Sequence, residues 1–435
     1  MRITQLSIEN YKSLRNITIS PTQLNVIVGA NAAGKSNFAD CLDFISDVYR
    51  HGLEMAVSRK GGYENIAFRK TRRSRKPIKI GLSVEFFSIN LSPLDREDRK
   101  TLTDVKVEHS FAFVTRGFSI RTAFEVIQEN LVISRRTSDE WEIIANLKRT
   151  IEDYSLDVKN ENERPDFHSG NLRFEDGLTL FRFFVGRDNL LPTELLISSV
   201  GGFVPLISMF QRVMGSIRVF QISPAQSRVF GIPTPTAELE RQGKNLPAVI
   251  DLLQKQHPEA WQLVMQAMRA ILPDLKSINV DYTPTKTLGL FFDEEGFGRP
   301  WGVDEVSDGT LQTLAILVAI FNPSSSVLVI EEPENSVHPW ILRHILDACR
   351  EASKNKQIIL TTHSPIIMNA VNPEEVWVIW RSKGESQLAP LTEIDPEFLA
   401  MWQHGDVSTF DYIDSGALPH AIPPEPSLVL DQEEE

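Results

Sequence analysis

The pattern of apolar and polar residues predicts that the chain begins with three strands and a helix. Apolar and polar residues alternate around Ile3 and again around Leu14, as in two half-buried strands. The apolar run from Leu24 to Val28 predicts a buried strand, and apolar residues then recur at helical spacing from Asn37 to Tyr49. Residues 24–49 therefore form a predicted strand–turn–helix unit.

The middle of the chain has a different pattern, which predicts a β-meander followed by a partly helical stretch. Its short alternating segments are Ile80–Phe86, Val105–Val107, Phe111–Phe113, Phe124–Val126 and Leu131–Ile133. Residues 148–177 are polar and acidic, and residues 178–214 are apolar and in part helical. Because residues 91–215 carry no chemical motif, we interpret them as an arm or lid inserted between two halves of one site.

From residue 216 onward, strands and helices alternate again. Strands are predicted at Ile217–Ser223, Ile278–Tyr282, Leu288–Phe292, Val327–Ile330, Gln357–Thr362 and Glu375–Trp380, the last with Ser386–Leu391 as its candidate partner. Helices are predicted at Leu246–Leu253, Pro258–Ile271, Leu311–Phe321 and from Ser336 to about Ala352. This alternation predicts an α/β fold with a mixed central sheet flanked by helices. We divide the chain into 1–90 and 216–395, the inserted region 91–215, and a tail, 396–435.

The turn of the first unit has the composition of a phosphate-binding loop. It reads Gly29-Ala30-Asn31-Ala32-Ala33-Gly34-Lys35-Ser36-Asn37, which contains the pattern G-x-x-x-x-G-K-S between a strand and a helix. Backbone N–H groups of residues 31–37 and the positive helix end would face phosphate oxygens. Lys35 would pair with the β- and γ-phosphates and the Ser36 hydroxyl would bind Mg²⁺. The alternative is an ordinary strand–turn–helix with coincidental glycines.

A second anion site is predicted where Ser307, Asp308 and Gly309 precede an apolar helix. A hydroxyl and a glycine at a helix start can bind a phosphate through backbone N–H groups. The alternative is an N-cap, in which Ser307 or Asp308 only satisfies the first turn.

Charged residues follow two of the predicted buried strands. Glu331 and Glu332 end the strand Val327–Ile330, where Glu331 would hold Mg²⁺ and Glu332 would polarise an attacking water. His363 follows the strand Gln357–Thr362 and could hydrogen-bond the γ-phosphate or that water. A surface carboxylate pair and a structural histidine are the alternatives.

Charge and composition narrow the classes of partner. The net charge of −13 means that contact with nucleic acid needs a local basic patch. One candidate patch is Arg69, Lys70, Arg72, Arg73, Arg75 and Lys76, and its alternatives are a solvated hairpin tip or a surface for an acidic protein. Cys41 and Cys349 both lie in apolar helical patterns, which favours buried reduced thiols. No signal peptide or membrane helix is predicted, so the cytoplasm is the expected location.

Taken together and in this order, the motifs resemble those of ABC-type ATPases of the RecF, SMC and OLD-nuclease branch. The matching sequence motifs include S-D-G-T, I-E-E-P-E-N, H-P and T-T-H-S-P, and the resemblance covers residues 1–90 and about 216–385. It is strongest to stand-alone bacterial ATPases, some of them halves of anti-phage defence pairs.

The resemblance implies a role for each motif. Lys35 and Ser36 match the Walker A lysine and Mg²⁺ ligand, and Ser307 and Gly309 match the signature motif. Glu331 matches the Walker B carboxylate, Glu332 the catalytic glutamate and His363 the switch histidine. In that family, the signature motif of one subunit completes the Walker A site of another. A homodimer, or a higher even-numbered oligomer, with two ATP molecules is therefore implied.

The chain departs from the family pattern at two places. The usual Walker B aspartate is Glu331, whose extra methylene favours a shifted or water-mediated metal contact. The second departure concerns the metal-binding glutamine that the family carries after the phosphate-loop helix: it cannot be placed in this chain, and it should fall near Tyr63 to Phe68. In addition, the end of the chain lacks the D-x-D of OLD-type nucleases: Asp411 and Asp414 are wrongly spaced in a loop-like segment, and the tail from Pro419 is predicted to be disordered or a docking peptide.

We therefore expect a slow ATPase that acts as a dimeric switch. ATP-driven closure would reposition residues 91–215 and control DNA binding or a separately encoded effector, such as a nuclease or toxin, in phage defence or DNA repair. One alternative is an interaction scaffold that binds ATP with negligible hydrolysis. Another is the energising subunit of a membrane transporter.

Overall fold

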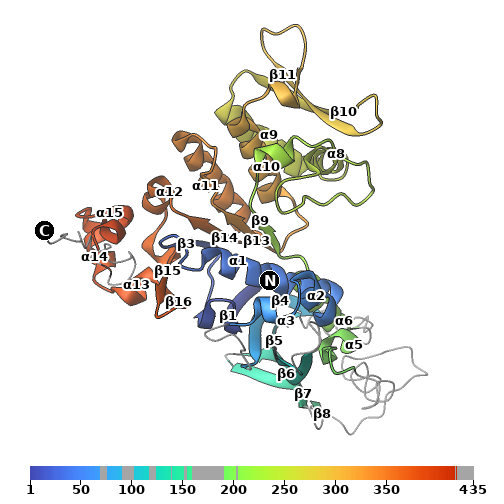
Figure 1. Ribbon diagram of the computed structural model, residues 1–435, viewed down its shortest axis with the longest axis vertical. Coiled ribbons are helices and arrows are strands. Elements are labelled where there is room, and N and C mark those ends of the chain that lie inside the picture. The colour runs from blue at the N-terminus through green and yellow to red at the C-terminus, as the bar shows by residue number, and fades with distance from the viewer. Residues whose placement is uncertain are drawn as a thin grey trace, which may run out of the picture.

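The computed structural model describes residues 1–68, 76–90, 102–116, 124–138, 140–150, 154–158, 191–201, 204–416 and 418. Within these residues, thirteen strands form one large mixed sheet and three strands form a small second sheet. Figure 1 shows helices on both sides of the large sheet. The α/β class predicted from the sequence is therefore confirmed.

One half of the large sheet is parallel. Its strands, in spatial order, are β15 (Val376–Ser382), β3 (Leu24–Val28), β14 (Gln357–Thr362), β13 (Val327–Glu331) and β9 (Arg218–Phe220). Every residue of β3, β13 and β14 is buried. Unbroken apolar runs are typical of parallel strands that are covered on both faces.

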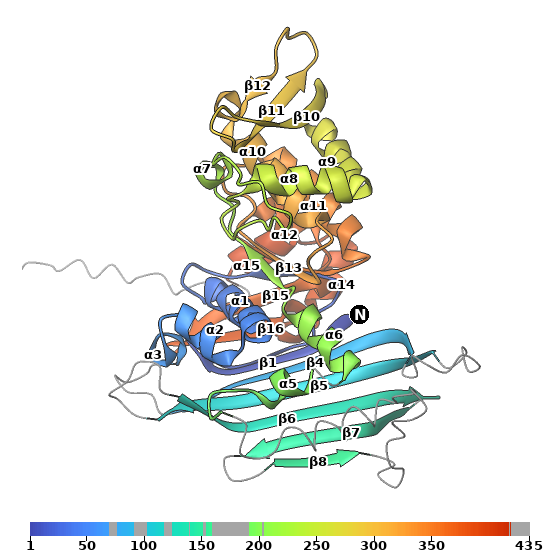
Figure 2. The same cartoon turned by 90° about the vertical axis from the view of Figure 1, so that its right-hand side faces the viewer.

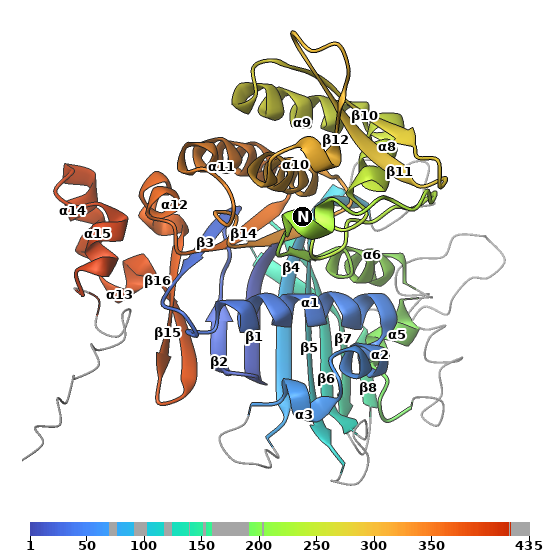
Figure 3. The same cartoon turned by 45° about the horizontal axis from the view of Figure 1, so that its top comes forward.

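Helices cover both faces of this parallel half. Because successive side chains of a strand point to opposite faces, Ile27 packs in the cluster that includes α1 (Lys35–His51), whereas Val26 packs in the cluster of α10 (Asp308–Phe321) and α11 (Pro339–Ser353). Figure 3 shows α1 on one side of β14 and α10 and α11 on the other. The phosphate loop and the Walker B strand thus lie within one layered core.

The other half of the large sheet is mainly antiparallel. Its strands continue from β15 in the order β16 (Glu385–Pro390), β2 (Leu14–Ile19), β1 (Arg2–Tyr11), β4 (Ile78–Asn90), β5 (Leu102–Thr115), β6 (Phe124–Thr137), β7 (Glu140–Thr150) and β8 (Tyr154–Val158). All neighbouring pairs are antiparallel except β16 and β2, which share one parallel bridge. Strands β5 to β8 therefore extend the sheet that begins with β1 and β2.

The predicted meander is present, but its strands are longer than expected. Strand β5 joins two of the predicted segments and β6 joins two others. The inward positions between these segments are His109 and Glu129, which are buried as a pair. His109 and Glu129 occupy positions on the buried face of the sheet where an apolar residue would be expected. The apolar alternation in the sequence is therefore interrupted at these two positions.

Short helices lie against the antiparallel half. They are α2 (Leu53–Arg59), α3 (Tyr63–Ile66), α5 (Leu196–Val200) and α6 (Pro205–Met214). Figure 2 shows α5 and α6 in front of the long strands β4 to β6. Their buried apolar residues share one cluster with α1, so this half and the phosphate-loop helix have a common core.

A lobe at the top of Figure 1 separates β9 from β13 along the chain. It consists of α7 (Pro224–Ser227), α8 (Leu246–Gln256), α9 (Pro258–Ile271), the small antiparallel sheet of β10 (Leu275–Tyr282), β11 (Leu288–Glu294) and β12 (Trp301–Gly302), and the short helix η2 (Val303–Glu305). It shares its apolar cluster with α10 and α11.

The chain ends in a group of short helices. These are α12 (Pro365–Ala370), η3 (Pro373–Glu375), α13 (Leu391–Ile394), α14 (Phe398–His404) and α15 (Thr409–Asp414). Asp411 and Asp414 lie on α15, so the predicted loop-like segment is helical; Ser408 caps this helix by accepting a hydrogen bond from Asp411 N–H. The predicted tail from Pro419 lies outside the described residues. None of the described helices is long and apolar enough to cross a bilayer.

Candidate functional site

The carboxyl ends of the parallel strands β3, β14, β13 and β9 lie side by side, and the first three carry most of the predicted site. Strand β3 leads into the phosphate loop, β13 ends at Glu331, and β14 is followed by His363. Because all these strands are parallel, their carboxyl ends meet at one edge of the sheet. The topology therefore brings together residues that are more than 300 positions apart.

The backbone of the phosphate loop has the turned conformation that its glycines predict. Gly34 has φ 122° and Ala32 has φ 61°, both in the left-handed region. A Cβ on Gly34 would lie 2.3 Å from Ser386 Oγ. Only glycine suits this position, because its backbone adopts the positive φ readily and because it has no Cβ to clash with Ser386.

Lys35, the first residue of α1, is buried against its own loop. Its Nζ donates to Gly29 O at 2.7 Å and to Ala30 O at 3.1 Å. Burial lowers the pKa of Lys35 to about 8, and the charges of Glu332 and Glu334 partly oppose this effect. The Lys35 ammonium group is thus close enough to interact electrostatically with both carboxylates. The next residue, Ser36, is exposed.

Two serines, Ser13 and Ser386, hold the phosphate loop in place, and no sequence pattern identified either of them. Ser386 of β16 donates from Oγ to Ala33 O at 2.6 Å, and the same Oγ lies 2.7 Å from Ser13 Oγ. Asn37 Nδ2 donates to Ser13 Oγ at 2.7 Å. No sequence signal marks this contact, because the two serines are 373 positions apart and meet only where β16 reaches β2.

Glu332 stands in a strained turn after β13. Its φ of 48° is uncommon for a residue with a side chain, and such outliers are frequent at functional sites. Its N–H donates to Thr361 O at 2.8 Å, and its Oε2 accepts from Asn335 Nδ2 at 2.9 Å. Its Oε1 lies 3.9 Å from His363 Nε2. The predicted catalytic pair therefore meets in the structure.

Glu334 is a further carboxylate that the sequence analysis passed over. Its Oε1 accepts from Thr362 Oγ1 at 2.8 Å and from His363 N–H at 2.7 Å. It therefore positions the backbone of the predicted switch histidine. Burial lowers the pKa of His363, and the charge of Lys35 lowers it further, while Glu332 and Glu334 oppose the shift. The neutral imidazole is thus favoured at pH 7.

Glu331 is buried and paired with an arginine that the sequence analysis did not identify. Arg241 Nη2 lies 2.6 Å from Glu331 Oε1, and Glu331 is 3% exposed. The carboxylate thus already binds one cation, and carboxylate and hydroxyl oxygens, such as those of Glu331 and Ser36, are ligands that suit Mg²⁺. Within the described residues, no group of three or more His, Cys, Asp or Glu could hold a metal alone. We therefore expect Mg²⁺ to bind together with phosphate oxygens.

A glutamine does follow one of the parallel strands, though not where we expected it. The stretch from Tyr63 to Phe68 contains no glutamine and begins with α3, in which Tyr63 and Ile66 are buried. Gln221 follows β9, and because Phe220 pairs with Ile330, Gln221 occupies the position next to Glu331. It is exposed, so it is the better candidate for the metal-binding glutamine.

The signature residues form a capped helix start. Ser307 caps α10 by accepting from Thr310 N–H at 3.1 Å, and Asp308 pairs with Arg228 at 2.6 Å. A Cβ on Gly309 would lie 2.9 Å from Ser336 O. Ser307 is thus an N-cap, and its side chain is exposed and still accessible to a ligand, so its predicted role at an anion site stays a prediction. None of these contacts, all between described residues, involves the phosphate loop of the same chain.

A pocket opens beside the phosphate loop. It has a volume of about 340 Å³, and its lining includes Lys12, Ser13, Asn37, Phe68 and Arg381. It adjoins the start of α1 through Asn37, so it has the place and size for a nucleoside whose phosphates occupy the loop.

The basic run lies almost entirely outside the described residues. Of its six members, only Lys76 is described, and Arg69 to Arg75 are not. Contact with DNA through this run therefore stays a prediction from the sequence. Cys41 and Cys349 are buried, as predicted, and burial raises the pKa of both thiols.

Known proteins with similar sequences are ATPases by name. A family model described as "AAA domain, putative AbiEii toxin, Type IV TA system" matches residues 24–369. The chain is 19% identical over 412 residues to "Retron Ec83 probable ATPase" of Escherichia coli, covering 90% of this chain and 73% of that protein. It is also 19% identical over 419 residues to "Retron Vc95 probable ATPase" of Vibrio cholerae serotype O1 biovar El Tor, covering 87% and 73%.

Among solved structures, the fold is similar to an SMC head. The crystal structure of "the SmcHead bound to the C-winged helix domain of ScpA" matches with a TM-score of 0.51 and 14% identity. The match covers 89% of this chain and 97% of that chain. At this identity the likeness establishes the fold alone.

Proposed function

The chain belongs to the AAA-domain family whose model matches residues 24–369, and we propose that it is an ATP-driven dimeric switch. It is a P-loop ATPase with an SMC-like head. The observation that best supports the proposal is the convergence of Lys35, Glu332 and His363 at one sheet edge, while Ser307 has its contacts elsewhere.

Binding of the triphosphate follows from the loop geometry. Phosphate oxygens would replace Gly29 O and Ala30 O as the partners of Lys35, and the backbone N–H groups at the start of α1 would face the same oxygens. Mg²⁺, when bound, would neutralise charge on the β- and γ-phosphates. Ser36 and Glu331, with Gln221 beside them, are the residues of this chain that would hold it.

Hydrolysis would depend on Glu332 and His363. Glu332 would accept a proton as a water oxygen attacks the γ-phosphorus, and the bond from that phosphorus to the bridging oxygen would break, releasing ADP and phosphate. The neutral His363 would donate a hydrogen bond to the γ-phosphate oxygens. Glu334 would hold this histidine in place through its backbone N–H.

The signature motif supports a dimer. Ser307 and its neighbours present exposed hydrogen-bonding groups at the start of α10, and a second copy could place them on the γ-phosphate of the first. Each ATP would then lie between two chains, and hydrolysis would open the pair. Such a cycle is switch-like, so we expect slow turnover.

A separately encoded effector is the proposed target of the switch. Two observations support this: the family description names a putative toxin, and the two relatives described above are named as probable ATPases of retrons. Within this chain, strands β5 to β7 share a core with the phosphate-loop helix and would move with it on dimer closure, and we propose that residues 91–215 pass the signal to the effector in phage defence.

Replacement of Glu332 by glutamine tests the catalytic assignment. We expect Glu332→Gln to bind ATP as the wild type does but to release phosphate about 10²- to 10⁴-fold more slowly, because the general base is lost. Bound nucleotide is measured by equilibrium titration and phosphate by a coupled assay. A Glu332→Gln variant that hydrolyses ATP at the wild-type rate would refute the assignment, and a wild type that binds ATP without releasing phosphate would favour the scaffold alternative.

A further inference from the structure

One segment of the chain contacts both Glu331 and the signature motif. Residues 221–245, called the bridging segment below, run from the end of β9 to the start of α8. Arg241 of this segment pairs with Glu331, and Arg228 of the same segment pairs with Asp308. We propose that the bridging segment links Glu331 to the signature motif. When Mg²⁺ replaces Arg241 as the cation at Glu331, Arg241 senses the exchange and Arg228 passes it to the start of the signature helix. This inference rests on the proposed binding of Mg²⁺ and ATP.

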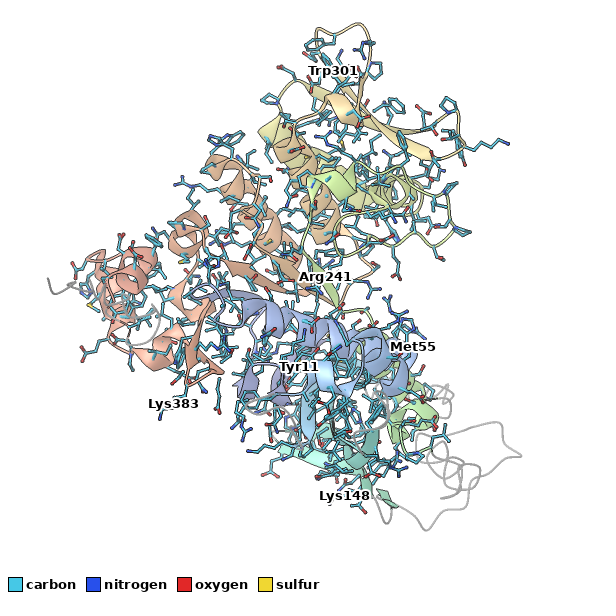
Figure 4. All side chains as sticks on the ribbon, viewed as in Figure 1. Tyr11, Met55, Lys148, Arg241, Trp301 and Lys383 are labelled. Carbon is cyan, nitrogen blue, oxygen red and sulfur yellow. The ribbon has the colours of Figure 1, made fainter. Side chains whose placement is uncertain are left out.

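Arg241 has two sets of carboxylate partners within reach. Its Nη2 lies 2.6 Å from Glu331 Oε1, while its Nη1 lies 3.8 Å from Asp40 Oδ1 and 3.7 Å from Asp43 Oδ2. Figure 4 shows Arg241 between the upper lobe and α1. Because Glu331 is buried, its charge needs a cation at all times. Mg²⁺ at Glu331 would repel the guanidinium, which could then move to the two aspartates on α1.

The backbone of the segment joins Arg241 to the neighbourhood of Arg228. Gln221 N–H donates to Arg241 O at 2.9 Å, and Ser223 N–H donates to Gln242 O at 3.0 Å, so the two ends of the segment run side by side. Gly243, with φ 87°, packs so closely that a Cβ would lie 2.4 Å from Ser227 Oγ.

Ser227 is fully buried and directly precedes Arg228. Close-packed contacts of this kind transmit small displacements, because no void is present to absorb them. A shift of Arg241 therefore moves the base of Arg228.

Arg228 holds the start of the signature helix. It donates from Nη2 to Val306 O at 2.8 Å and to Asp308 Oδ1 at 2.6 Å, and from Nη1 to Val303 O. A second link lies one turn along α10, where the buried Gln312 donates to Ile222 O at 3.1 Å. The residues on both sides of Ser307 are thus tied to the bridging segment, which sets the position of its hydroxyl.

Variants of Arg241 test the sensor. In the full-length Glu332→Gln background, the Mg²⁺ concentration for half-maximal binding of a fluorescent ATP analogue is measured. We expect Arg241→Gln to lower it about tenfold, because a competing positive charge is removed, and Arg241→Lys, which keeps the charge, to leave it near the parent value. A purely structural salt bridge would give no such change in Mg²⁺ dependence.

Hydrogen exchange of residues 303–312, with and without Mg²⁺-ATP, tests the transmission when it is measured at a protein concentration at which the chain is monomeric, because contact of Ser307 with the nucleotide of a second copy would itself change the exchange. We expect the parent protein and Arg241→Lys to show a change in exchange on addition of Mg²⁺-ATP, and Arg241→Gln to show none. Arg228→Gln should keep the parent Mg²⁺ dependence but lose the exchange response. This second variant decides the question alone if Arg241→Gln does not fold.

Two results would overturn the inference: an Arg241→Gln variant with the parent Mg²⁺ dependence, or an unchanged exchange response in both glutamine variants. A parent protein that binds no nucleotide would instead refute the proposed function, and it would do so before any variant is compared.

Discussion

Burial and charge act in opposite directions on Lys35. Desolvation lowers its pKa to about 8, whereas Glu332 and Glu334 favour the charged form. Phosphates would favour the charged form far more strongly, because they bring negative charge into contact with Nζ. The affinity for ATP should therefore depend on pH in the range where the unbound lysine loses its proton.

We expect the affinity for ATP to be constant below pH 8 and to fall by up to about tenfold per pH unit above it. The sign follows because binding above pH 8 must first return a proton to Lys35. Equilibrium titration between pH 7 and 9.5 measures the effect. Lys356→Met is the control and should keep the pH dependence of the wild type: burial also lowers the pKa of Lys356 to about 8, but among the described residues its Nζ bonds only Asn322 O and Ser325 Oγ. A wild-type affinity that does not change up to pH 9.5 would contradict the expectation.

The sequence identified Lys35, Glu332 and His363 through their motifs, but not the residues that hold them. Glu334, Arg241 and Ser386 act through contacts with partners that lie 29, 90 and 353 positions away. Glutamate, arginine and serine are common surface residues, so their identity carries no signal until the fold shows what they touch.

A buried polar triad connects α1 to the antiparallel half of the sheet. Tyr49 Oη of α1 lies 2.6 Å from His109 Nδ1 of β5, and His109 Nε2 lies 3.0 Å from Glu129 Oε1 of β6. Glu129 also accepts from the N–H groups of Leu196 and Ile197 at 2.6 and 2.9 Å. Three elements are thus bound to the phosphate-loop helix through the partly buried Tyr49 and the fully buried pair of His109 and Glu129.

Removal of Glu129 should be costly to stability. We expect Glu129→Leu to lower the free energy of unfolding by about 3–5 kcal/mol, because His109 and two N–H groups would lose a buried charged partner. Tyr49→Phe should cost only about 1 kcal/mol, the loss of one hydrogen bond.

Urea unfolding measures both variants. On the same strand, Glu125→Gln breaks only an exposed pair with Arg116 and should change stability by less than about 1 kcal/mol. Equal losses for Glu129→Leu and Glu125→Gln would show that the triad does not bind these elements together.

The whole molecule separates the two surfaces that we propose contact the nucleotide. The Walker residues meet at the edge of the parallel half, whereas Ser307 begins a helix whose contacts are with the upper lobe and with Ser336. If each ATP lies between two copies, a chain with a damaged Walker A site can still supply an intact signature motif.

Mixing two inactive variants tests this arrangement. Lys35→Ala and Ser307→Arg should each lack ATPase activity alone. Mixed in equal amounts, they should recover about a quarter of the wild-type rate, since half of the dimers are mixed and each has one intact site of two. Phosphate release measures the recovery, and a mixture of Lys35→Ala with Lys35→Met is the control. An equal mixture that stays as inactive as its parts would exclude sites shared between copies.

Local pattern was enough to establish the strand–loop–helix unit at residues 24–49, the buried strand that ends at Glu331 and the α/β class, because apolar periodicity and glycine positions are properties of neighbouring residues. The long strands β5 and β6 escaped the same reasoning, since His109 and Glu129 face inward and are satisfied by each other, by Tyr49 and by the N–H groups of Leu196 and Ile197. Tertiary structure alone decided the pairing of Arg241 with Glu331, the serine support behind Gly34 and the place of Gln221. Each of these depends on which strands become neighbours, and strand order is set by the packing of the whole chain, not by any short segment of it.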